Sequence, residues 1–331
     1  KIFSTALLIG IQDVNNNVAE AREHLNELSE LVRTLGIVRR PELFVVVKDI
    51  NPAYFVGSGK ALEIANIAKE LAAEIIIFDC ELSPPQQRNL EELSKLPVID
   101  RQEVIIDIFA ARARTKEASI QVELARYQYY LPRLKRAWTH LSRQRGGALG
   151  TKGEGEQQIE IDRRIVRTKI VSLQQELSEI QRRRDLERNL SKRNKIARVA
   201  IVGYTNAGKS SLLRALTNAD VYVEDKLFET LDTTARKVEL NSSSVIFSDT
   251  VGFIRKLPHS LVEAFKSTLE EAVYSDLLVH VLDASSPYWE EHLRTTLSVL
   301  NELGAGEKEI ITALNKADLL DDPLKKAVLR S

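Results

Sequence analysis

Two hydrophobic patterns alternate along the first third of the chain. Short apolar runs rich in β-branched residues, STALLIGI, ELFVVVK and EIIIFD, predict buried strands. Between them, apolar residues recur with a helical period, as in NVAEAREHLNELSELVRTLG, which ends at Gly36 as helices often do. This alternation predicts a mostly parallel α/β domain over residues 1–111. The stretch VGSGKALE (56–63) resembles a phosphate loop, but Tyr54 and Ala61 replace the required glycine and hydroxyl residue, so we expect a structural role for it.

Residues 112–194 have a heptad-like pattern instead. Between its two apolar segments lies RQRGGALGTKGEGE (143–156), whose five glycines favour neither helix nor strand. The pattern predicts an antiparallel coiled-coil hairpin with this loop at its tip, and Pro132 is expected to kink or end the first helix. Trp138 is expected to pack in the hairpin in preference to stacking on a base. The apolar residues recur at alternating spacings of four and three: Ile120, Leu124, Tyr127, Leu131, Leu134, Trp138 and Leu141, then Val166, Ile170, Leu173, Leu177 and Ile180.

The motif GYTNAGKS (203–210) follows the apolar run IARVAIVG and precedes the helical pattern SLLRALTNA. This order of strand, loop and helix fits a phosphate-binding loop, whose backbone N–H groups surround phosphate oxygens. We expect Lys209 to reach the β- and γ-phosphates of a nucleotide and Ser210 to coordinate Mg²⁺. The residues expected to contact the nucleotide here are Gly203, Tyr204, Thr205, Asn206, Ala207, Gly208, Lys209, Ser210 and Ser211.

A second motif, SDTVG (248–252), follows the apolar run SSVIF. We expect Asp249 to hold Mg²⁺ through water and the backbone N–H of Gly252 to meet the γ-phosphate, with Thr250 and Val251 between them. Many GTPases follow this motif with a glutamine that orients the attacking water, but here the next residue is Phe253. A phenyl ring has no donor or acceptor, so intrinsic hydrolysis is expected to be slow unless another group or a partner positions the water.

The motif NKAD (315–318) follows a third apolar run, EIITAL, and predicts that the base is guanine. The carboxylate of Asp318 can accept hydrogen bonds from the ring N–H and the amine of guanine, a pattern that adenine does not supply. We expect Asn315 to bond the base edge and hold the phosphate loop. The stem of Lys316 is expected to pack over the ring, with Ala317 beside it.

Between the first two motifs lies KLFETLDTTARK (226–237), in which we expect Thr230 to bind Mg²⁺ and the γ-phosphate in the triphosphate state. The expected nucleotide contacts of this segment are Phe228, Glu229, Thr230, Leu231 and Asp232. Residues 195–331 are therefore predicted to form a P-loop GTPase domain of doubly wound topology. Its predicted catalytic residues are Lys209, Gly252 and Thr230, and its predicted metal ligands are Ser210, Thr230 and Asp249.

Charge and composition indicate the kind of partner and the cellular compartment of the protein. The net charge is zero, yet residues 112–152 contain ten lysines and arginines against two glutamates, which indicates a polyanionic partner. Cys80 is the only cysteine, which excludes an internal disulfide, fits a reducing cytosol and indicates a packing residue in preference to a nucleophile. No apolar stretch reaches the roughly 18–20 residues of a membrane span, and no signal-peptide pattern opens the chain, so we expect a cytoplasmic protein.

Four stretches, DTVGFIRKLPHSLVEAF, FETLD, DRQEVIIDIFAARART and WTHLSRQRGG…GTKGEGE, together resemble the HflX family of bacterial GTPases over nearly the whole chain. The resemblance implies hydrolysis of GTP, and often of ATP, that ribosomes stimulate. It also implies binding to the large ribosomal subunit and, in some members, splitting of stalled or stressed 70S ribosomes. The hairpin of the family is held near the peptidyl-transferase centre, so Arg143, Arg145 and Lys152 are expected to contact rRNA phosphates.

The implied ligands are GTP or GDP and Mg²⁺, and we expect a monomer. The serine-alanine-lysine guanine loop of the family is expected after a further strand, whereas the sequence ends at Ser331, so we expect a GTPase domain truncated at its C-terminus. Two other functions stay open: a GTP-dependent assembly factor for the large subunit, and a GTPase switch that recruits protein partners through the hairpin. The basic loop favours RNA over protein but does not separate splitting from assembly.

Overall fold

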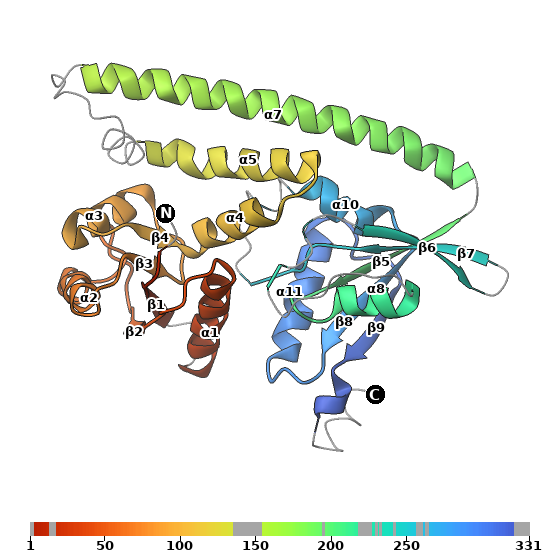
Figure 1. Ribbon diagram of the computed structural model, residues 1–331, viewed down its shortest axis with the longest axis horizontal. Helices are drawn as coiled ribbons and strands as arrows, with labels where there is room; N and C mark the ends of the chain where they lie inside the picture. The colour runs from red at the N-terminus through yellow and green to blue at the C-terminus, as the bar shows by residue number, and fades with distance from the viewer. Residues whose placement is uncertain are drawn as a thin grey trace. The chain divides into compact units, whose positions relative to one another are not determined.

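The computed structural model forms two compact units, whose elements Figure 1 shows in chain order. The first unit contains residues 1–108 and 126–171, and the second contains residues 109–125 and 172–331. The residues that the structure describes are 3–12, 18–134, 154–193, 196–217, 227–228, 231, 234–240, 243–255, 261 and 265–320.

The first unit contains a parallel sheet with the strand order β2-β1-β3-β4, which confirms the predicted α/β architecture. Three of its strands coincide with the three apolar runs of the sequence. The short β4 was not predicted, because so brief a run has no detectable period. The strands are β1 (Ala6–Gln12), β2 (Glu42–Val46), β3 (Ile75–Phe78) and β4 (Val98–Asp100), and the helices are α1 (Val18–Thr34), α2 (Ser58–Glu70), α3 (Pro84–Ser94) and α4 (Arg101–Arg112).

Helices cover both faces of this sheet because successive side chains of β1 point to opposite faces. Leu7 and Ile9 pack in the same apolar core as Ile64 of α2. On the other face Gly10 makes room for α1, since a Cβ at this position would lie only 2.8 Å from Cδ2 of Leu25. Burial on both faces explains why these strands are continuous apolar runs.

Two sequence features of the first unit have the structural roles that we predicted. Cys80 is half-buried and packs against the apolar core just after β3. The stretch 56–63 contains the start of α2, with Gly57 as its N-cap. Lys60 lies on this helix and its Nζ is 2.7 Å from the carboxylate of Glu63, a surface ion pair between residues three apart.

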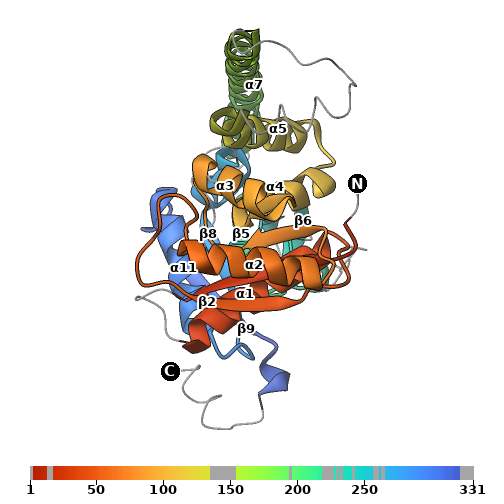
Figure 2. The same ribbon diagram turned by 90° about the vertical axis from the view of Figure 1, so that its left-hand side faces the viewer.

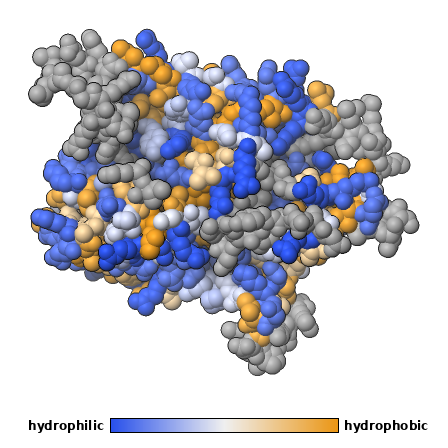
Figure 3. Space-filling model, in the orientation of Figure 1, coloured by the Kyte–Doolittle hydropathy of each residue, from blue (hydrophilic) through white to orange (hydrophobic). Residues whose placement is uncertain are grey.

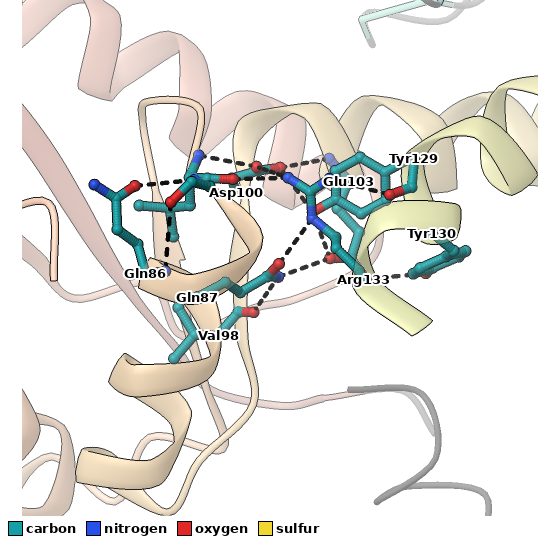
Figure 4. A network of polar contacts seen from close by, with 10 residues as sticks. Gln86, Gln87, Val98, Asp100, Glu103, Tyr129, Tyr130 and Arg133 are labelled. Atoms are coloured by element: carbon teal, nitrogen blue, oxygen red, sulfur yellow. Dashed lines mark hydrogen bonds and ion pairs between the residues drawn. The ribbon is translucent and has the colours of Figure 1, made fainter. Parts of the chain in front are cut away.

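A buried polar network in the first unit ties the turn after α5 (Lys116–Tyr130) to β4 (Figure 4). Arg133 donates to Oε1 of Gln87 at 2.9 Å and to the carbonyl of Leu82 at 2.7 Å, and its Nη2 lies 3.5 Å from Asp100. The Tyr129 hydroxyl donates to Asp100 at 3.2 Å. Burial raises the pKa of the Asp100 carboxyl to about 6, although backbone hydrogen bonds and Arg133 oppose the rise.

The middle of the chain contains α5 and α7 (Glu154–Arg193), which lie side by side in both views (Figure 1; Figure 2). Nζ of Lys116 lies 2.7 Å from Glu176, and Nη2 of Arg184 lies 2.7 Å from Glu117. The start of α5 therefore pairs with the second half of α7, as in the predicted antiparallel hairpin. As expected from Pro132, α5 ends at Tyr130 and a 3₁₀ turn follows (Leu131–Arg133).

The predicted apolar seam of α7 is its covered side. Val166, Ile170, Leu173, Leu177 and Ile180 are buried or half-buried. Ile165, which lies off the seam, is 60% exposed. In Figure 3, hydrophobic patches alternate with hydrophilic ones on the surface where α7 lies. The charged residues of α7 distinguish this long helix from a membrane span. In the described part of the chain, no helix is long and apolar enough to cross a bilayer.

The predicted end of the glycine-rich loop at residue 156 is wrong, because α7 begins at Glu154. Glu154 and Glu156 in the first turn favour a helix N-terminus, and this offsets the cost of about 1 kcal/mol for Gly155. The rest of the loop lies outside the described residues, and with it Trp138, Arg143, Arg145 and Lys152.

The second unit contains a five-stranded sheet with the order β6-β7-β5-β8-β9, in which only β6 and β7 pair antiparallel. This is the predicted doubly wound topology. The strands are β5 (Ala197–Gly203), β6 (Thr234–Leu240), β7 (Ser243–Asp249), β8 (Leu277–Asp283) and β9 (Ile310–Asn315). The helices are α8 (Lys209–Thr217), α10 (Lys266–Tyr274), α11 (Trp289–Glu302) and the 3₁₀ turn η2 (Ala317–Leu319).

Four strands of this sheet end on residues that carry the predicted chemistry or lie beside it. They are Gly203, Asp249, Asp283 and Asn315, the last residues of β5, β7, β8 and β9. Because these strands are parallel, their carboxyl ends meet at one edge of the sheet. Ligands of open parallel α/β sheets bind at this edge.

Candidate nucleotide-binding site

The loop after β5 is shaped by a glycine near each end. Gly203 has φ +148° and Gly208 has φ +97°, which are conformations that favour glycine. A Cβ on Gly203 would collide with the carbonyl of Val281, and a Cβ on Gly208 would collide with the amide of Asn315. The loop is therefore packed against β8 and the NKAD motif, and α8 begins directly after it, so the first N–H groups of the helix are available to a ligand.

The ammonium of Lys209 lies over this loop and is almost fully buried. Its Nζ donates a hydrogen bond to the carbonyl of Tyr204 at 2.8 Å. A Cβ on Gly252 would lie 2.9 Å from this Nζ and 2.7 Å from Cα of Thr205, so no side chain fits at Gly252. The structure thus brings together the lysine and the glycine that the two motifs predicted for the phosphate site.

Ser210 and Asp249 meet at the start of α8. The Ser210 hydroxyl donates to Oδ2 of Asp249 at 2.7 Å, and both side chains are buried. Hydroxyl and carboxylate oxygens are the ligands that Mg²⁺ prefers, and in phosphate sites substrate oxygens and water complete its octahedron. These two residues therefore fit a magnesium ion. Thr230, the third predicted ligand, lies outside the described residues.

The segment after Asp249 is fastened to the phosphate loop by two backbone hydrogen bonds. The N–H of Thr205 donates to the carbonyl of Phe253 at 2.7 Å, and the N–H of Phe253 donates to the carbonyl of Gly203 at 3.1 Å. The Phe253 ring is 1% exposed. Thr250 uses its buried hydroxyl to bond the carbonyl of Ile201, so this side chain supports the strand.

Tyr204, one of the predicted nucleotide contacts, has a side chain that supports the loop. Its ring stacks on His292 of α11 at 3.9 Å between centroids. Its hydroxyl accepts a hydrogen bond from the backbone N–H of Arg255 at 2.9 Å, and Arg255 in turn pairs with Glu291 at 3.0 Å. Sequence reasoning missed these partners, because nothing local links α11 to the loop.

The NKAD motif reaches the phosphate loop through its asparagine. Nδ2 of Asn315 donates to the carbonyl of Ala207 at 2.8 Å, which confirms the predicted contact with the loop. Nζ of Lys316 lies 2.9 Å from Oδ2 of Asp283. Asp318 lies in η2 and is exposed, so its carboxylate is accessible to a base.

The segment between the first two motifs contacts the loop at one described position. The backbone N–H of Phe228 donates to the hydroxyl of Thr205 at 2.9 Å. Phe228 and Leu231 are both buried. Glu229, Thr230 and Asp232 lie outside the described residues, so their predicted contacts stay predictions.

Comparison with known proteins identifies the family. Residues 22–110 match the family described as GTP-binding GTPase N-terminal, residues 112–190 match GTP-binding GTPase Middle Region, and residues 198–316 match 50S ribosome-binding GTPase. GTPase HflX of Akkermansia muciniphila is 50% identical over 99% of this chain and 77% of its own length. The chain belongs to the HflX family of GTPases. GTPase HflX of Escherichia coli K12 is 45% identical over 91% of this chain and 70% of its own length.

A solved relative supports the fold of this HflX chain. The crystal structure of SsGBP in a complex with GDP is 29% identical, with a TM-score of 0.54, and the match covers 98% of this chain and 86% of that one. The HflX chain therefore has the P-loop GTPase fold, with a helical middle region and a preceding α/β region.

Two residues of β8 in the HflX chain belong to the surroundings of the site but carry no sequence motif. Burial opposes ionisation of Asp283, but Lys316 and the hydrogen bonds of Ser285 outweigh burial, so the pKa of this carboxyl is lowered. His280 is 1% exposed, and burial with the nearby charge of Lys209 lowers its pKa to about 4, so its ring is neutral. In the sequence, the one signal for these two residues was their position at or near the end of an apolar run, β8, which places them near the site.

Proposed function

We propose that this HflX chain binds GTP with Mg²⁺, hydrolyses it to GDP and phosphate, and uses its nucleotide state to control binding to the large ribosomal subunit. The observation that carries the proposal is the 2.7 Å hydrogen bond between Ser210 and Asp249, because it joins the phosphate-loop and DTVG motifs at one cation site. The finer role that we propose is splitting or rescue of stalled and stressed 70S ribosomes.

The proposed reaction uses groups that already surround the loop. Lys209 exchanges the carbonyl of Tyr204 for β- and γ-phosphate oxygens, which are charged and therefore stronger acceptors. Gly252 brings its N–H to the γ-phosphate. Ser210, Asp249 and Thr230 hold Mg²⁺, which neutralises the charge on the phosphate oxygens when bound. Gly203–Ser211, 228–232 and 249–252 contain the proposed nucleotide contacts.

In this proposed mechanism, residue 253 has no side chain that can orient the attacking water. The Phe253 ring is buried and has no polar atom, while its backbone is held in two hydrogen bonds with the loop. The attacking water must therefore be positioned by a group outside this residue. We propose that the ribosome brings about this positioning and so stimulates turnover.

Base selection is proposed to depend on Asp318, with Asn315, Lys316 and Ala317 at the ring. Asn315 is already bonded to the loop carbonyl of Ala207, so base and phosphate recognition share one rigid support. ATP lacks the ring N–H and amine that a carboxylate reads, so we propose that any ATP hydrolysis is a weaker side activity.

Contact with rRNA is proposed for Arg143, Arg145 and Lys152. The support is the charge of residues 112–152, with ten cationic residues and two glutamates. We propose a cytoplasmic monomer in which residues 1–111, 112–194 and 195–331 act as α/β domain, ribosome-contacting hairpin and GTPase domain.

Sucrose-gradient sedimentation of 70S ribosomes with the purified chain tests this function. With a non-hydrolysable GTP analogue, we expect the chain in the large-subunit fractions and conversion of 70S particles into subunits. GDP, and the Ser210→Ala variant with the analogue, serve as controls and should leave 70S particles intact. Binding to free large subunits without splitting would favour an assembly factor. Sedimentation apart from every ribosomal particle would favour a switch that recruits proteins.

A further inference from the structure

A closed set of contacts joins the phosphate loop, the chain after the DTVG motif and the first turn of α11. The hydroxyl of Tyr204 accepts the backbone N–H of Arg255 at 2.9 Å. The guanidinium of Arg255 donates to Oε2 of Glu291 at 3.0 Å. The next residue of α11, His292, stacks on Tyr204 with 3.9 Å between ring centroids and 12° between planes. We call these four residues, Tyr204, Arg255, Glu291 and His292, the α11 clamp.

The α11 clamp is buried where it meets the loop. Tyr204 and Arg255 are each 5% exposed, and the hydrogen bond between them is buried. Leaving a buried backbone donor without its acceptor costs roughly tenfold or more in an equilibrium constant. The pair of Arg255 with Glu291 is charge-assisted, and the stacked rings restrict the position of the tyrosine. The clamp therefore fixes Arg255 relative to the loop.

The α11 clamp is attached to the same backbone that faces the proposed γ-phosphate. The carbonyl of Tyr204 accepts a hydrogen bond from Nζ of Lys209 at 2.8 Å. The backbone of Tyr204 also forms a parallel bridge with Phe253. Arg255 follows Phe253 by two residues and Gly252 by three, and the N–H of Gly252 is proposed to meet the γ-phosphate. Tyr204 thus connects the lysine of one motif with the glycine of the other.

We propose that the residues of the α11 clamp are positioning residues for GTP hydrolysis: they hold the N–H of Gly252 and the ammonium of Lys209 in one arrangement while charge develops on the γ-phosphate. This inference rests on the proposed GTP hydrolysis. Because Phe253 offers no polar side chain, catalysis depends on donors whose position the backbone fixes in advance. A displaced donor lowers the rate, whereas the remaining phosphate contacts preserve the affinity for the nucleotide.

Steady-state kinetics of Tyr204→Phe test this inference, because the variant loses the hydroxyl and keeps a ring to stack on His292. We expect kcat for GTP to fall about tenfold, with KM within about threefold and GDP affinity within about twofold of wild type. The basal kcat and the kcat with large ribosomal subunits should fall by the same factor, because the α11 clamp acts within the site in both reactions.

The partners of Tyr204 offer pairs of conservative and disruptive variants. Glu291→Gln keeps an acceptor for Arg255, and His292→Phe keeps a stacked ring, so each should retain kcat to within about threefold. Glu291→Ala and His292→Ala remove these contacts and should lower kcat further than their conservative partners. Tyr204→Phe combined with Glu291→Ala should be less than additive, because both changes act on Arg255.

Tyr129→Phe is the matched control, since Tyr129 is a buried tyrosine of the first unit whose hydroxyl donates to Asp100. It should lower the melting temperature and leave kcat unchanged. If Tyr204→Phe behaves like this control, or raises kcat, the inference is overturned. An equal loss of GDP affinity would make Tyr204 a support of the loop alone, which also overturns it. If wild type hydrolyses no GTP with or without large subunits, the proposed function is wrong, which is a separate result.

Discussion

The side-chain amide of Asn315 donates a 2.8 Å hydrogen bond to the carbonyl of Ala207, so the NKAD motif braces the phosphate loop across 108 residues of chain. Because Gly208 next to Ala207 has no side chain, the amide can approach this closely. The same motif therefore has a structural part, through Asn315, and an exposed part, through Asp318.

These two parts predict two different mutant phenotypes. Asn315→Ala leaves a loop carbonyl without its partner, and we expect about tenfold weaker binding of both GTP and GDP. Asp318→Asn leaves the brace intact and should exchange preference for guanine with preference for xanthine. Fluorescence titrations with GTP and with GDP measure the first effect, and competition between GTP and xanthosine triphosphate measures the second. Strong retention of GTP by Asp318→Asn would exclude Asp318 as the base reader.

Lys209→Ala and Ser210→Ala should abolish productive binding of Mg·GTP. The first removes the proposed charge partner of the phosphates, and the second removes a proposed metal ligand whose hydroxyl lies 2.7 Å from Oδ2 of Asp249. The serine effect should depend on Mg²⁺, so titrations with and without the cation separate the two variants. Thr217→Ala, at the other end of α8, removes a hydroxyl that donates to the carbonyl of Leu213 and should bind like wild type. Unchanged affinities in both site variants would show the assignment to be wrong.

Basal GTP hydrolysis should be slow and should rise when large ribosomal subunits are added. Phe253→Gln should not accelerate the basal reaction, because residue 253 is buried and its backbone is already bonded to Gly203 and Thr205. A glutamine side chain at this buried position would contact protein atoms and not the attacking water. Phosphate release measured with and without large subunits tests this. Fast hydrolysis by the chain alone, insensitive to ribosomes, contradicts the prediction.

Replacing Arg143, Arg145 and Lys152 by alanine should weaken binding to the large subunit and flatten its salt dependence by roughly two to three log–log units. Each phosphate contact releases counterions, with a slope of about −0.7 to −0.9 per contact. GTP binding should be unaffected. Ribosome cosedimentation across a salt series measures the slope. Alanine at Arg164, Arg167 and Arg182, exposed cations of α7, removes the same charge and should have a smaller effect; equal effects would mean that only net charge matters.

Asp100 should make the first unit less stable as pH rises. Burial raises its pKa from 3.8 to about 6, so the folded chain binds the proton more tightly than the unfolded chain does. The contribution of this carboxyl to the free energy of unfolding is complete below pH 3.8 and is lost as pH rises through 6. The loss is about 3 kcal/mol, at roughly 1.4 kcal/mol per unit of pKa shift. Hydrogen exchange of the β3 and β4 amides over this range measures it.

The variant Asp100→Asn removes this titration and serves as the comparison. Its amide faces the donors of Leu82 and Arg133, so it should be less stable at every pH, but its stability should change less between pH 4 and 6. Equal pH slopes for the two chains would mean that Asp100 does not titrate in this range.

Much of the second unit could be predicted from sequence because its chemistry is local. The geometry of the phosphate loop depends on residues that adjoin one another, from Gly203 to Ser210, and glycines mark where the backbone turns. The buried strands could also be predicted from the sequence, since burial on both faces requires a run of apolar residues. Heptad spacing located the covered side of α7, and Pro132 located the end of α5, since a proline cannot continue the hydrogen-bond ladder.

Tertiary structure decided what depends on residues distant in the chain. The sequence could not pair Lys316 with Asp283, stack Tyr204 on His292 or place Arg255 against Glu291, because none of these pairs has a fixed spacing. The network around Asp100 is hidden for the same reason, since Gln87, Tyr129 and Arg133 come from three elements. Local backbone preference determines which residues form a loop or strand, whereas the path of the whole chain determines which buried side chains become neighbours.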